Sequence, residues 1–329
     1  MVTLRKAKNP TKPELDIPDS IDEPNIYNAS DSVYSTPSQS PFPVFVLCQP
    51  CFVDTKIKNN IWMKKAKGKE VEIDHEAFMG EWWNFYQLIA HSALVYLLPP
   101  TRGLQDQVYV NSFVYLPHIE SRDTIILSNF TAPGRAGEEI VAGKFLESMG
   151  YRCIKSPFKF EGEPELKWLR DNIYFGGWGI RSEIQTHQWI EKQFDAEIIT
   201  IQEKDEWCYH LDCNLFVLDE NNVMCCTETI DKSTIKQIEK VANIYPVTKD
   251  QCYEDICNIV RAGDMIICAS GVEFMKDDDP LYKLQKDKND RLEKICHDMG
   301  FEITFLQMDE NSKSGAATSC LCAHLNYGC

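Results

Sequence analysis

The chain has 329 residues, and its 34 Lys and Arg against 50 Asp and Glu give a formal net charge of −16 and a pI near 4.9. This length allows one or two domains with a large core. The acidic balance argues against a broad nucleic-acid surface and favours a soluble protein that attracts cationic ligands. The N-terminus lacks the apolar segment of a signal peptide, and the most apolar predicted helix, residues 76–98, is interrupted by polar side chains. We therefore expect a cytoplasmic protein that binds neither nucleic acid nor membrane.

Fourteen cysteines in such a chain predict reduced thiols rather than a disulfide framework. Cys48 and Cys51 have the spacing of zinc ligands, but no second pair of Cys or His completes a set of four, so we predict no zinc site there. The one basic stretch, residues 56–69, is predicted to be a solvated loop.

Residues 1–43 carry seven of the 16 prolines, many Ser and Asp, and no helix or strand periodicity. Such a composition predicts a disordered N-terminal arm. A compact domain is predicted to begin at the strand 44–47 and to occupy residues 44–329.

Within that domain one pattern recurs, namely an amphipathic helix, a tight stop and a short apolar strand. The strands that follow the stops are residues 107–115, 151–154, 196–201, 244–247 and 301–306. Hairpin-like pairs between the helices, such as 208–218 with 222–227, make each unit mixed α and β. Five units of roughly 50 residues, without a Gly-rich turn after the first strand, do not fit a doubly wound sheet. The spacing indicates five similar units that could close into a ring with a polar site on its axis.

Two groups of polar residues stand out in the middle of the chain. His210 and Asp212 alternate with apolar residues in the predicted strand 208–218, on a face that continues with apolar side chains, which favours a pocket over a solvent-exposed face. The second group, Phe160-Glu-Gly-Glu-Pro-Glu165, taken alone is typical of an acidic surface turn. In a pocket, however, the Glu161 carboxylate would pair with a guanidinium in bidentate geometry.

Other single residues have plainer interpretations. His187 shares a helix face with apolar residues and is predicted to be a core histidine, and the aromatic residues of 82–86 are predicted to pack in the helix interface. Cys320 follows small residues that allow close backbone approach and a nearby N–H donor. A thiol, an imidazole and carboxylates together suit nucleophilic attack on a cationic carbon. Cys322 would point to the opposite strand face and pack.

Four motifs resemble, in order, those of the guanidine-modifying hydrolases of the pentein fold. They are Phe160-Glu-Gly162, Gly176-Gly-Trp-Gly-Ile-Arg-Ser-Glu183 with His187-Gln188, Tyr209-His-Leu-Asp212 and Gly315-Ala-Ala-Thr-Ser-Cys-Leu321. This superfamily includes arginine deiminases, dimethylarginine dimethylaminohydrolases and amidinotransferases. The chain is most similar to the arginine dihydrolase branch, which it also resembles in Leu47-Cys-Gln-Pro50, Asn60-Ile-Trp-Met63 and Val108-Tyr-Val-Asn-Ser112. The match runs from about Val44 to Asn326 and implies a five-bladed α/β propeller with pseudo-fivefold symmetry, in agreement with the five units.

The resemblance also implies roles for individual residues. Cys320 is the implied nucleophile, and His210 is the implied general acid and base. The residues implied to bind substrate are Glu161 and Asp212 at the guanidinium, Arg181 at the carboxylate, and Asn60 and Asn111 along the pocket. No metal or organic cofactor is implied.

The sequence departs from the family pattern at one point. Where the family has Glu-Gly-x-Gly-Asp, this chain has Glu161-Gly-Glu-Pro-Glu165, which leaves the identity of the second acid open. Asn111 is the discriminating position, because deiminases carry Asp there, whereas an amide can hold a neutral ureido group as well as a guanidinium. The N-terminal arm has no counterpart in the family pattern.

These observations predict a hydrolase of a free guanidino amino acid, most simply arginine, that acts in two rounds to give ornithine, ammonia and carbon dioxide. The alternatives are a single-round arginine deiminase or dimethylarginine dimethylaminohydrolase, an amidinotransferase, and a pentein-fold binding protein without catalysis. The joint presence of Cys320, His210, Glu161 and Arg181 argues against the binding protein. The expected partner is a small molecule, and the sequence leaves oligomerisation open. The negative charges of Glu161 and Asp212 are expected to raise the pKa of the Cys320 thiol.

Overall fold

The computed structural model describes residues 34–64 and 71–328. Its contacts divide the chain into Met1–Ser35 and Thr36–Cys329, and only the second unit is treated below. The predicted disordered arm lies, up to residue 33, outside the described residues. Residues 36–43 belong to the second unit, because the Ser38 N–H donates to the Tyr151 hydroxyl over 3.0 Å and the two hydroxyl oxygens lie 2.6 Å apart.

The strands of the described chain form five three-stranded sheets with one topology. In each sheet the middle strand pairs antiparallel with the first strand and parallel with the third. In that order the sheets are β15 (Cys322–Asn326), β1 (Val44–Cys48) and β2 (Leu94–Leu98); β3 (Phe113–Tyr115), β4 (Thr124–Leu127) and β5 (Arg152–Lys155); β6 (Leu166–Arg170), β7 (Ile173–Trp178) and β8 (Glu197–Gln202); β9 (Leu215–Asp219), β10 (Asn222–Cys226) and β11 (Asn243–Val247); β12 (Val260–Ala262), β13 (Met265–Ala269) and β14 (Glu302–Leu306). We call β15, β3, β6, β9 and β12 the leading strands.

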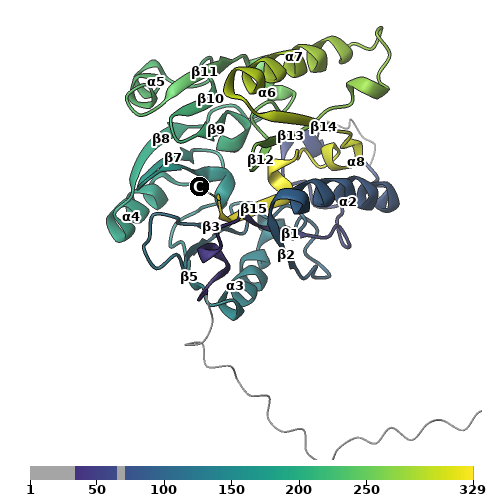
Figure 1. Ribbon diagram of the computed structural model, residues 1–329. Coiled ribbons are helices and arrows are strands. Elements are labelled where there is room, and N and C mark those ends of the chain that lie inside the picture. The colour runs from purple at the N-terminus through teal and green to yellow at the C-terminus, as the bar shows by residue number, and fades with distance from the viewer. Residues whose placement is uncertain (1–33, 65–70, 329) are drawn as a thin grey trace, which may run out of the picture. The chain divides into compact units, whose positions relative to one another are not determined.

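A helix crosses from the middle strand to the third strand in every sheet, as a parallel pair requires. These crossover helices are α2 (His75–Ser92), α3 (Glu138–Ser148), α4 (Ile184–Phe194), α5 (Lys232–Ile238) and α7 (Tyr282–Met299). Figure 1 shows them at the periphery, with the strands between them. The short helices are α1 (Ile61–Lys64), α6 (Lys249–Tyr253) and α8 (Asp309–Ser312), and the 3₁₀ turns are η2 (Pro37–Gln39), η3 (Pro133–Arg135), η4 (Glu163–Glu165), η5 (Leu211–Cys213), η6 (Val272–Phe274) and η7 (Ser319–Leu321). The predicted pentein architecture of five α/β units is confirmed.

Element boundaries agree with the prediction in most units and differ in two. The predicted strands 151–154, 196–201, 244–247 and 301–306 correspond to β5, β8, β11 and β14. The prediction that helix 76–98 continues past Ser92 is wrong, because Leu94–Leu98 pairs in parallel with β1 along its whole length. The predicted strand 107–115 is a strand only over its last three residues, since β4 offers partners only to those.

The segment before β9 also differs from the expected strand. Cys213 N–H donates to His210 O over 3.1 Å and Asn214 N–H to Leu211 O over 2.8 Å, which makes residues 211–213 the 3₁₀ turn η5. The pairing with β10 begins only at Leu215, so the preceding residues have no ladder to join. His210 and Asp212 therefore do not share a strand face.

The core predictions hold for most residues. Trp82 and Phe85 of α2 are buried, whereas Trp83 is 49% exposed, so the expectation of packing was wrong for that residue. His187 is fully buried, with Nε2 2.6 Å from Gly177 O, and burial lowers its pKa to about 4. A neutral imidazole in this position is the predicted core histidine.

Two carboxyl groups are buried together beneath η5. Glu165 and Glu203 both approach Gly177, where a Cβ atom would lie 2.3 Å from Glu165 Oε2 and 2.7 Å from Glu203 Oε1. Burial raises the pKa of Glu165 to about 7, and burial together with the Glu165 charge raises that of Glu203 well above its ordinary value. The pair therefore holds a proton at neutral pH. Leu211 donates its N–H to Glu165 Oε2 over 3.4 Å, so the pair supports the turn that follows His210.

This pair makes stability depend on pH in a defined direction. The ordinary carboxyl pKa is 4.5, so both groups ionise in the unfolded chain while the folded protein keeps its proton. The free energy of unfolding should thus fall as pH rises from 4.5 through about 7 and beyond.

A substitution can test the shared proton. Glu203→Gln would donate an N–H to Glu165 and remove the free-energy cost of keeping a proton on the pair. In urea denaturation, we expect the free energy of unfolding of this variant to decline less steeply with pH. Near pH 8.5 it should exceed that of the parent by about 1–2 kcal/mol. Glu197→Gln, at the exposed first residue of β8, is the control, and a parent-like slope for Glu203→Gln would contradict the shared proton.

The last strand completes the first sheet, which gives a second prediction. Leu325 of β15 is fully buried, whereas Leu97 of β2, in the same sheet, is 40% exposed. Leu325→Ala should lower the free energy of unfolding by about 2–5 kcal/mol, and Leu97→Ala by less than about 1 kcal/mol. Equal losses in chemical denaturation would show that the closing strand contributes no more than an ordinary surface strand.

Candidate active site

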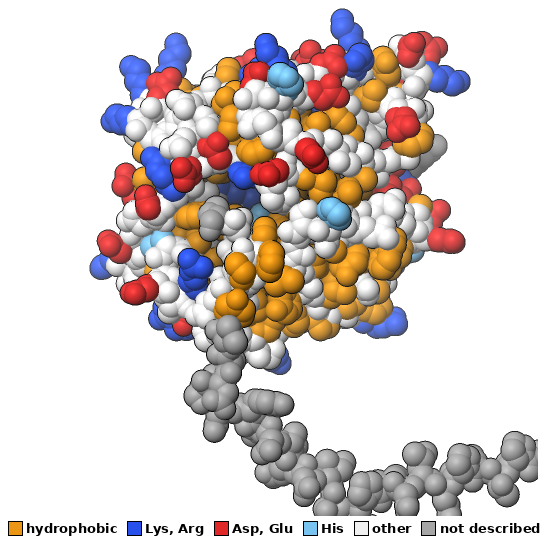
Figure 2. Space-filling model, in the orientation of Figure 1, with side chains coloured by type: hydrophobic (Ala, Val, Ile, Leu, Met, Phe, Trp, Pro, Cys, Tyr) orange, Lys and Arg blue, Asp and Glu red, His pale blue; other side chains and the backbone are white. Residues whose placement is uncertain are grey.

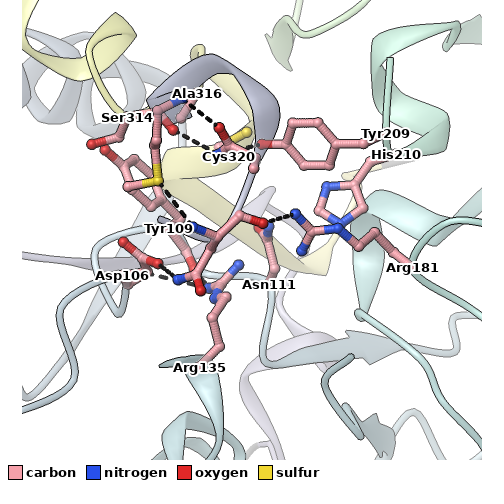
Figure 3. A pocket seen from close by; sticks show the side chains of 13 residues that line it. Asp106, Tyr109, Asn111, Arg135, Arg181, Tyr209, His210, Ser314, Ala316 and Cys320 are labelled. Atoms are coloured by element: carbon pink, nitrogen blue, oxygen red, sulfur yellow. Dashed lines mark hydrogen bonds between the residues drawn. The ribbon is translucent and has the colours of Figure 1, made fainter. Parts of the chain in front are cut away.

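The candidate active site lies where the leading strands begin. Asn111, Asn258 and Cys320 each stand two residues before a leading strand, namely β3, β12 and β15, and Asp212 stands three residues before β9. The pocket at this end is narrow, with a cavity volume of about 20 Å³ (Figure 3). It is lined by Asn59, Asn60, Met63, Asp106, Tyr109, Asn111, Arg135, Arg181, Tyr209, His210, Ser314, Ala316 and Cys320.

Glu161 is fully buried and holds the pocket's imidazole. Its Oε1 accepts the N–H groups of Thr131 and Ala132, each over 3.1 Å. Its Oε2 lies 2.8 Å from His210 Nε2 and 3.0 Å from Arg181 Nη1. Burial alone would raise the Glu161 pKa, but the hydrogen bond with His210 and the nearby positive charges outweigh it and lower the pKa to about 2. The carboxylate is therefore ionised and orients the imidazole.

Glycine is required beside Glu161. Gly162 has φ +71°, and a Cβ atom there would lie 2.2 Å from the backbone oxygen of Asn111. Any other residue would push the Glu161 segment away from the start of β3. The glycine of the Phe160-Glu-Gly162 motif thus brings two predicted site residues together.

Cys320 lies in η7, between the small-residue segment and β15. It is 4% exposed, and its Sγ lies 3.4 Å from Asn258 Nδ2. Burial raises the pKa of the thiol to about 12 and Asp212 adds to the rise, while hydrogen bonds from the Ala317 N–H and Asn258 oppose it. The predicted direction is confirmed, but burial rather than charge is the larger cause. At neutral pH the free thiol is protonated.

The two pocket arginines are already engaged. Arg181 Nη2 donates to Asn59 O over 2.6 Å, Nη1 pairs with Glu161, and the guanidinium lies 4.7 Å above the Tyr209 ring. Arg135 Nη2 donates to Glu138 over 2.6 Å and its guanidinium is buried beneath the pocket. The implied role of Arg181 at a substrate carboxylate stays a prediction, because its guanidinium here contacts the acid.

The two predicted asparagines differ in what they offer. Asn60 Nδ2 donates to Ser314 O over 2.8 Å, and its Oδ1 accepts the Met63 N–H over 3.0 Å, so its amide holds the pocket wall. Asn111 is 3% exposed, and among the described residues its Oδ1 has no hydrogen-bond partner. A buried acceptor of this kind is costly unless a ligand satisfies it.

Several predicted acids lie outside the pocket lining. Asp212 Oδ2 accepts the Ser319 hydroxyl over 2.6 Å behind the thiol, and Asp212 does not line the pocket in this structure. Glu163 accepts the His324 N–H over 2.7 Å, which ties η4 to the closing strand. Glu165 pairs with Glu203. Glu161 does not line the pocket either, but of the three acids in Glu161-Gly-Glu-Pro-Glu165 it is the one that contacts lining residues, namely His210 and Arg181.

Sequence analysis missed several pocket residues. Asn59, Asp106 and Arg135 stand alone in the sequence, without a motif that would single them out, and Tyr109 lies in the Val108-Tyr-Val-Asn-Ser112 segment but was given no role. Asn258 was missed as well, because its place two residues before a leading strand, like that of Asn111 and Cys320, is visible only once the strands are placed.

Composition-based expectations can be compared with the described part of the chain. The 13 cysteines described there are all free thiols. Within residues 34–64 and 71–328, no group of three or more His, Cys, Asp or Glu is arranged to hold a metal ion. None of the helices in those ranges is long and apolar enough to cross a membrane. Figure 2 shows acidic and basic side chains interspersed on the face in view rather than gathered into a basic surface.

The sequence matches known proteins along most of its length. A family profile for eukaryotic N,N dimethylarginine dimethylhydrolases matches residues 51–323. The bifunctional arginine dihydrolase/ornithine cyclodeaminase AgrE of Nostoc sp. is 25% identical over 289 residues, which are 84% of this chain and 37% of that protein. The N(G),N(G)-dimethylarginine dimethylaminohydrolase of Mycobacterium tuberculosis is 26% identical over 182 residues, 54% of this chain and 57% of that one. The chain thus spans little more than a third of the length of its cyanobacterial relative.

Solved structures share the fold. The N-terminal domain of ArgZ, a cyanobacterial arginine dihydrolase bound to substrate, superposes with a TM-score of 0.74 at 24% identity, covering 86% of this chain and 98% of that one. DDAH from Pseudomonas aeruginosa, complexed with citrulline, gives 0.66 at 14% identity, covering 86% and 99%. Both likenesses agree with the architecture of five α/β units. Because the family profile covers most of its length, the chain belongs to the eukaryotic N,N-dimethylarginine dimethylhydrolase family, within the guanidine-modifying pentein superfamily that its motifs resemble.

Proposed function

We propose that this protein hydrolyses the guanidino group of free arginine through a covalent intermediate on Cys320, in two rounds that end at ornithine. The catalytic unit would be the domain predicted for residues 44–329. The observation that carries the proposal is the 2.8 Å contact between His210 Nε2 and Glu161 Oε2, at the pocket that also contains the Cys320 thiol. A base oriented by a carboxylate beside a nucleophile is the arrangement that covalent hydrolysis needs.

In the first step, the Cys320 sulfur bonds to the guanidino carbon while His210 takes the thiol proton. The carbon then releases one nitrogen, which leaves as ammonia after His210 returns the proton to it. The product is an amidino group bound to sulfur. Glu161 keeps the imidazole oriented in this step, because its Oε2 lies 2.8 Å from His210 Nε2.

In the second step, His210 removes a proton from water, and the hydroxide adds to the same carbon. The carbon–sulfur bond breaks, the thiol is restored, and citrulline is formed. Repetition on citrulline releases a second ammonia and leaves a carbamic acid, which loses carbon dioxide to give ornithine. The sum is one arginine and two waters giving one ornithine, two ammonia and one carbon dioxide.

Recognition of a guanidinium is supported by an interaction within the protein. Glu161 already pairs with a guanidinium, that of Arg181, 3.0 Å away and above the ring of Tyr209. We assign Arg181, with the positive charge of Arg135 behind it, to the substrate carboxylate. Asp212 is assigned to the guanidinium together with Glu161, for which the Ser319 hydroxyl must yield its contact with the carboxylate.

Family membership favours one alternative, a single round on a dimethylated guanidino group. The same thiol and imidazole would then release dimethylamine instead of ammonia. The deciding experiment incubates the protein with arginine and with dimethylarginine, and measures ammonia, dimethylamine, citrulline and ornithine. Two ammonia per ornithine from arginine is the expected result. Citrulline as the end product would make it a deiminase, and no turnover of either compound would remove the hydrolase proposal.

The nucleophile can be tested with two neighbouring cysteines. Cys320→Ser should abolish turnover while the substrate still binds, because a hydroxyl is a far weaker nucleophile without a strong base. Cys322→Ser should retain most activity, since Cys322 packs in the core. Steady-state rates and calorimetric binding would check this. The opposite pattern would move the nucleophile to Cys322.

The two-round outcome is expected to depend on Asn111. An ionised Asp there pairs with a guanidinium but repels the carbonyl oxygen of citrulline, at a cost of about 1–3 kcal/mol in a desolvated site. Asn111→Asp should therefore consume arginine, accumulate citrulline and make ornithine roughly tenfold more slowly. Chromatography of the products over time measures both compounds. Unimpaired ornithine formation by the variant would refute the role of the amide.

A further inference from the structure

A buried amide lies against the thiol of Cys320. Asn258 is 2% exposed and stands two residues before β12, so the start of a different sheet brings it to the nucleophile. Its Nδ2 is 3.4 Å from Cys320 Sγ, and its Oδ1 is 3.6 Å away. The amide therefore contacts the atom that would form the covalent bond, although its residue belongs to no motif found in the sequence.

The orientation of this amide is fixed by its neighbours. The Ser319 N–H lies 3.2 Å from Asn258 Oδ1, and a backbone N–H can only donate. The oxygen of the amide must therefore face Ser319, which leaves Nδ2 as the atom nearest the sulfur. The backbone is held as well, because the Thr318 hydroxyl donates to Asn258 O over 3.1 Å.

We propose that Asn258 is a catalytic residue that donates its Nδ2–H to the Cys320 thiolate. The inference rests on the proposed function of Cys320 as nucleophile and deepens it. The site has a clear need for such a donor, because burial and the charge of Asp212 both disfavour a negative sulfur. The Ala317 N–H is the other donor at the sulfur.

Ser319 links this donor to the substrate clamp. Its hydroxyl oxygen lies 2.6 Å from Asp212 Oδ2 and 2.8 Å from Asn258 Oδ1, but it has one proton to donate. When no substrate is bound, the Ser319 hydroxyl donates this proton to Asp212, because the contact with the carboxylate is the shorter of the two. A guanidinium on Asp212 would release the proton to Asn258, which polarises the amide and strengthens its donation to sulfur. Substrate binding and thiolate formation are thereby coupled.

The test compares two substitutions of Asn258 in the full chain. Asn258→Asp keeps the acceptor for the Ser319 N–H but lacks the donor, whereas Asn258→Leu is neutral and lacks both. The measurement is the rate of Cys320 alkylation by iodoacetamide between about pH 7 and 10, with the modified residue located by mass spectrometry. We expect both variants to react at least about tenfold more slowly than the parent throughout this range, which corresponds to a further rise of about one unit or more in the thiol pKa.

Each other pattern overturns the proposal. If alkylation of Cys320 is slowed in Asn258→Leu alone, the residue serves only to hold Ser319. If alkylation is slowed in Asn258→Asp alone, the added charge is the cause. Asn289→Leu is the matched control. The Asn289 amide on α7 is also buried, but it donates to the Ser270 hydroxyl, so Cys320 in this variant should be alkylated as fast as in the parent. Thermal unfolding of each variant identifies any loss of folded protein.

The readout separates this proposal from the proposed function. Alkylation needs no turnover, so a protein that fails to hydrolyse arginine can still show the donor effect, and an active enzyme can lack it. In the active enzyme, both Asn258 variants should lower kcat at least about tenfold with a smaller change in KM. The other titratable groups around the thiol are shared by all variants, and they include His210 of the same pocket lining and Asp212, Asp255, Tyr109, Tyr209, Cys213 and Cys322.

Discussion

One fully buried carboxylate, that of Glu161, organises this site. Removing an ionised carboxyl group from water costs several kcal/mol, so the fold must supply donors to both of its oxygens. Thr131 and Ala132, which follow β4, bind one oxygen, and Arg181, which follows β7, and His210, which precedes β9, bind the other. Three separate loops are thereby tied to one group. The His210 imidazole, which would act on substrate, is held in place because the buried Glu161 carboxylate needs it as a hydrogen-bond partner.

The segment Glu161-Gly-Glu-Pro-Glu165, which departs from the family pattern, shows how a few residues can serve several parts of the fold. Glu161 contacts His210 of the pocket lining, Glu163 turns to His324 on the closing strand, and Glu165 joins Glu203 beneath η5. A longer acid at Glu165 fits because Gly177 leaves room for two carboxyl groups. The loss of the usual Gly and Asp has therefore not disturbed the contacts of Glu161 with His210 and Arg181, since Glu163 and Glu165 have their partners elsewhere.

Sequence periodicity was sufficient for the five α/β units, because their third strands and crossover helices have strong local patterns. It failed at Leu94–Leu98 and at η5, where pairing with a distant strand, or the lack of it, overrides local preference. Motifs brought Cys320, His210 and Glu161 into one site, but they could not show that Asp212 lies behind Ser319. Asn258 contributes to the site through the equivalence of the five units, a signal that appears only once the strands are placed.

The closing strand has a consequence for how the chain could be rearranged. Val44 on β1 pairs with Asn326 on β15, and a Cβ atom on Gly328 would lie 2.5 Å from the Pro43 ring, so both ends of the folded unit meet. A closed ring of similar units has no intrinsic first member. A circular permutant that joins these ends with a short linker and opens the exposed turn between β9 and β10 would keep every strand pairing. Its sequence would begin in a different sheet and still assemble the same pocket, with Cys320 in the interior of the chain instead of near its end.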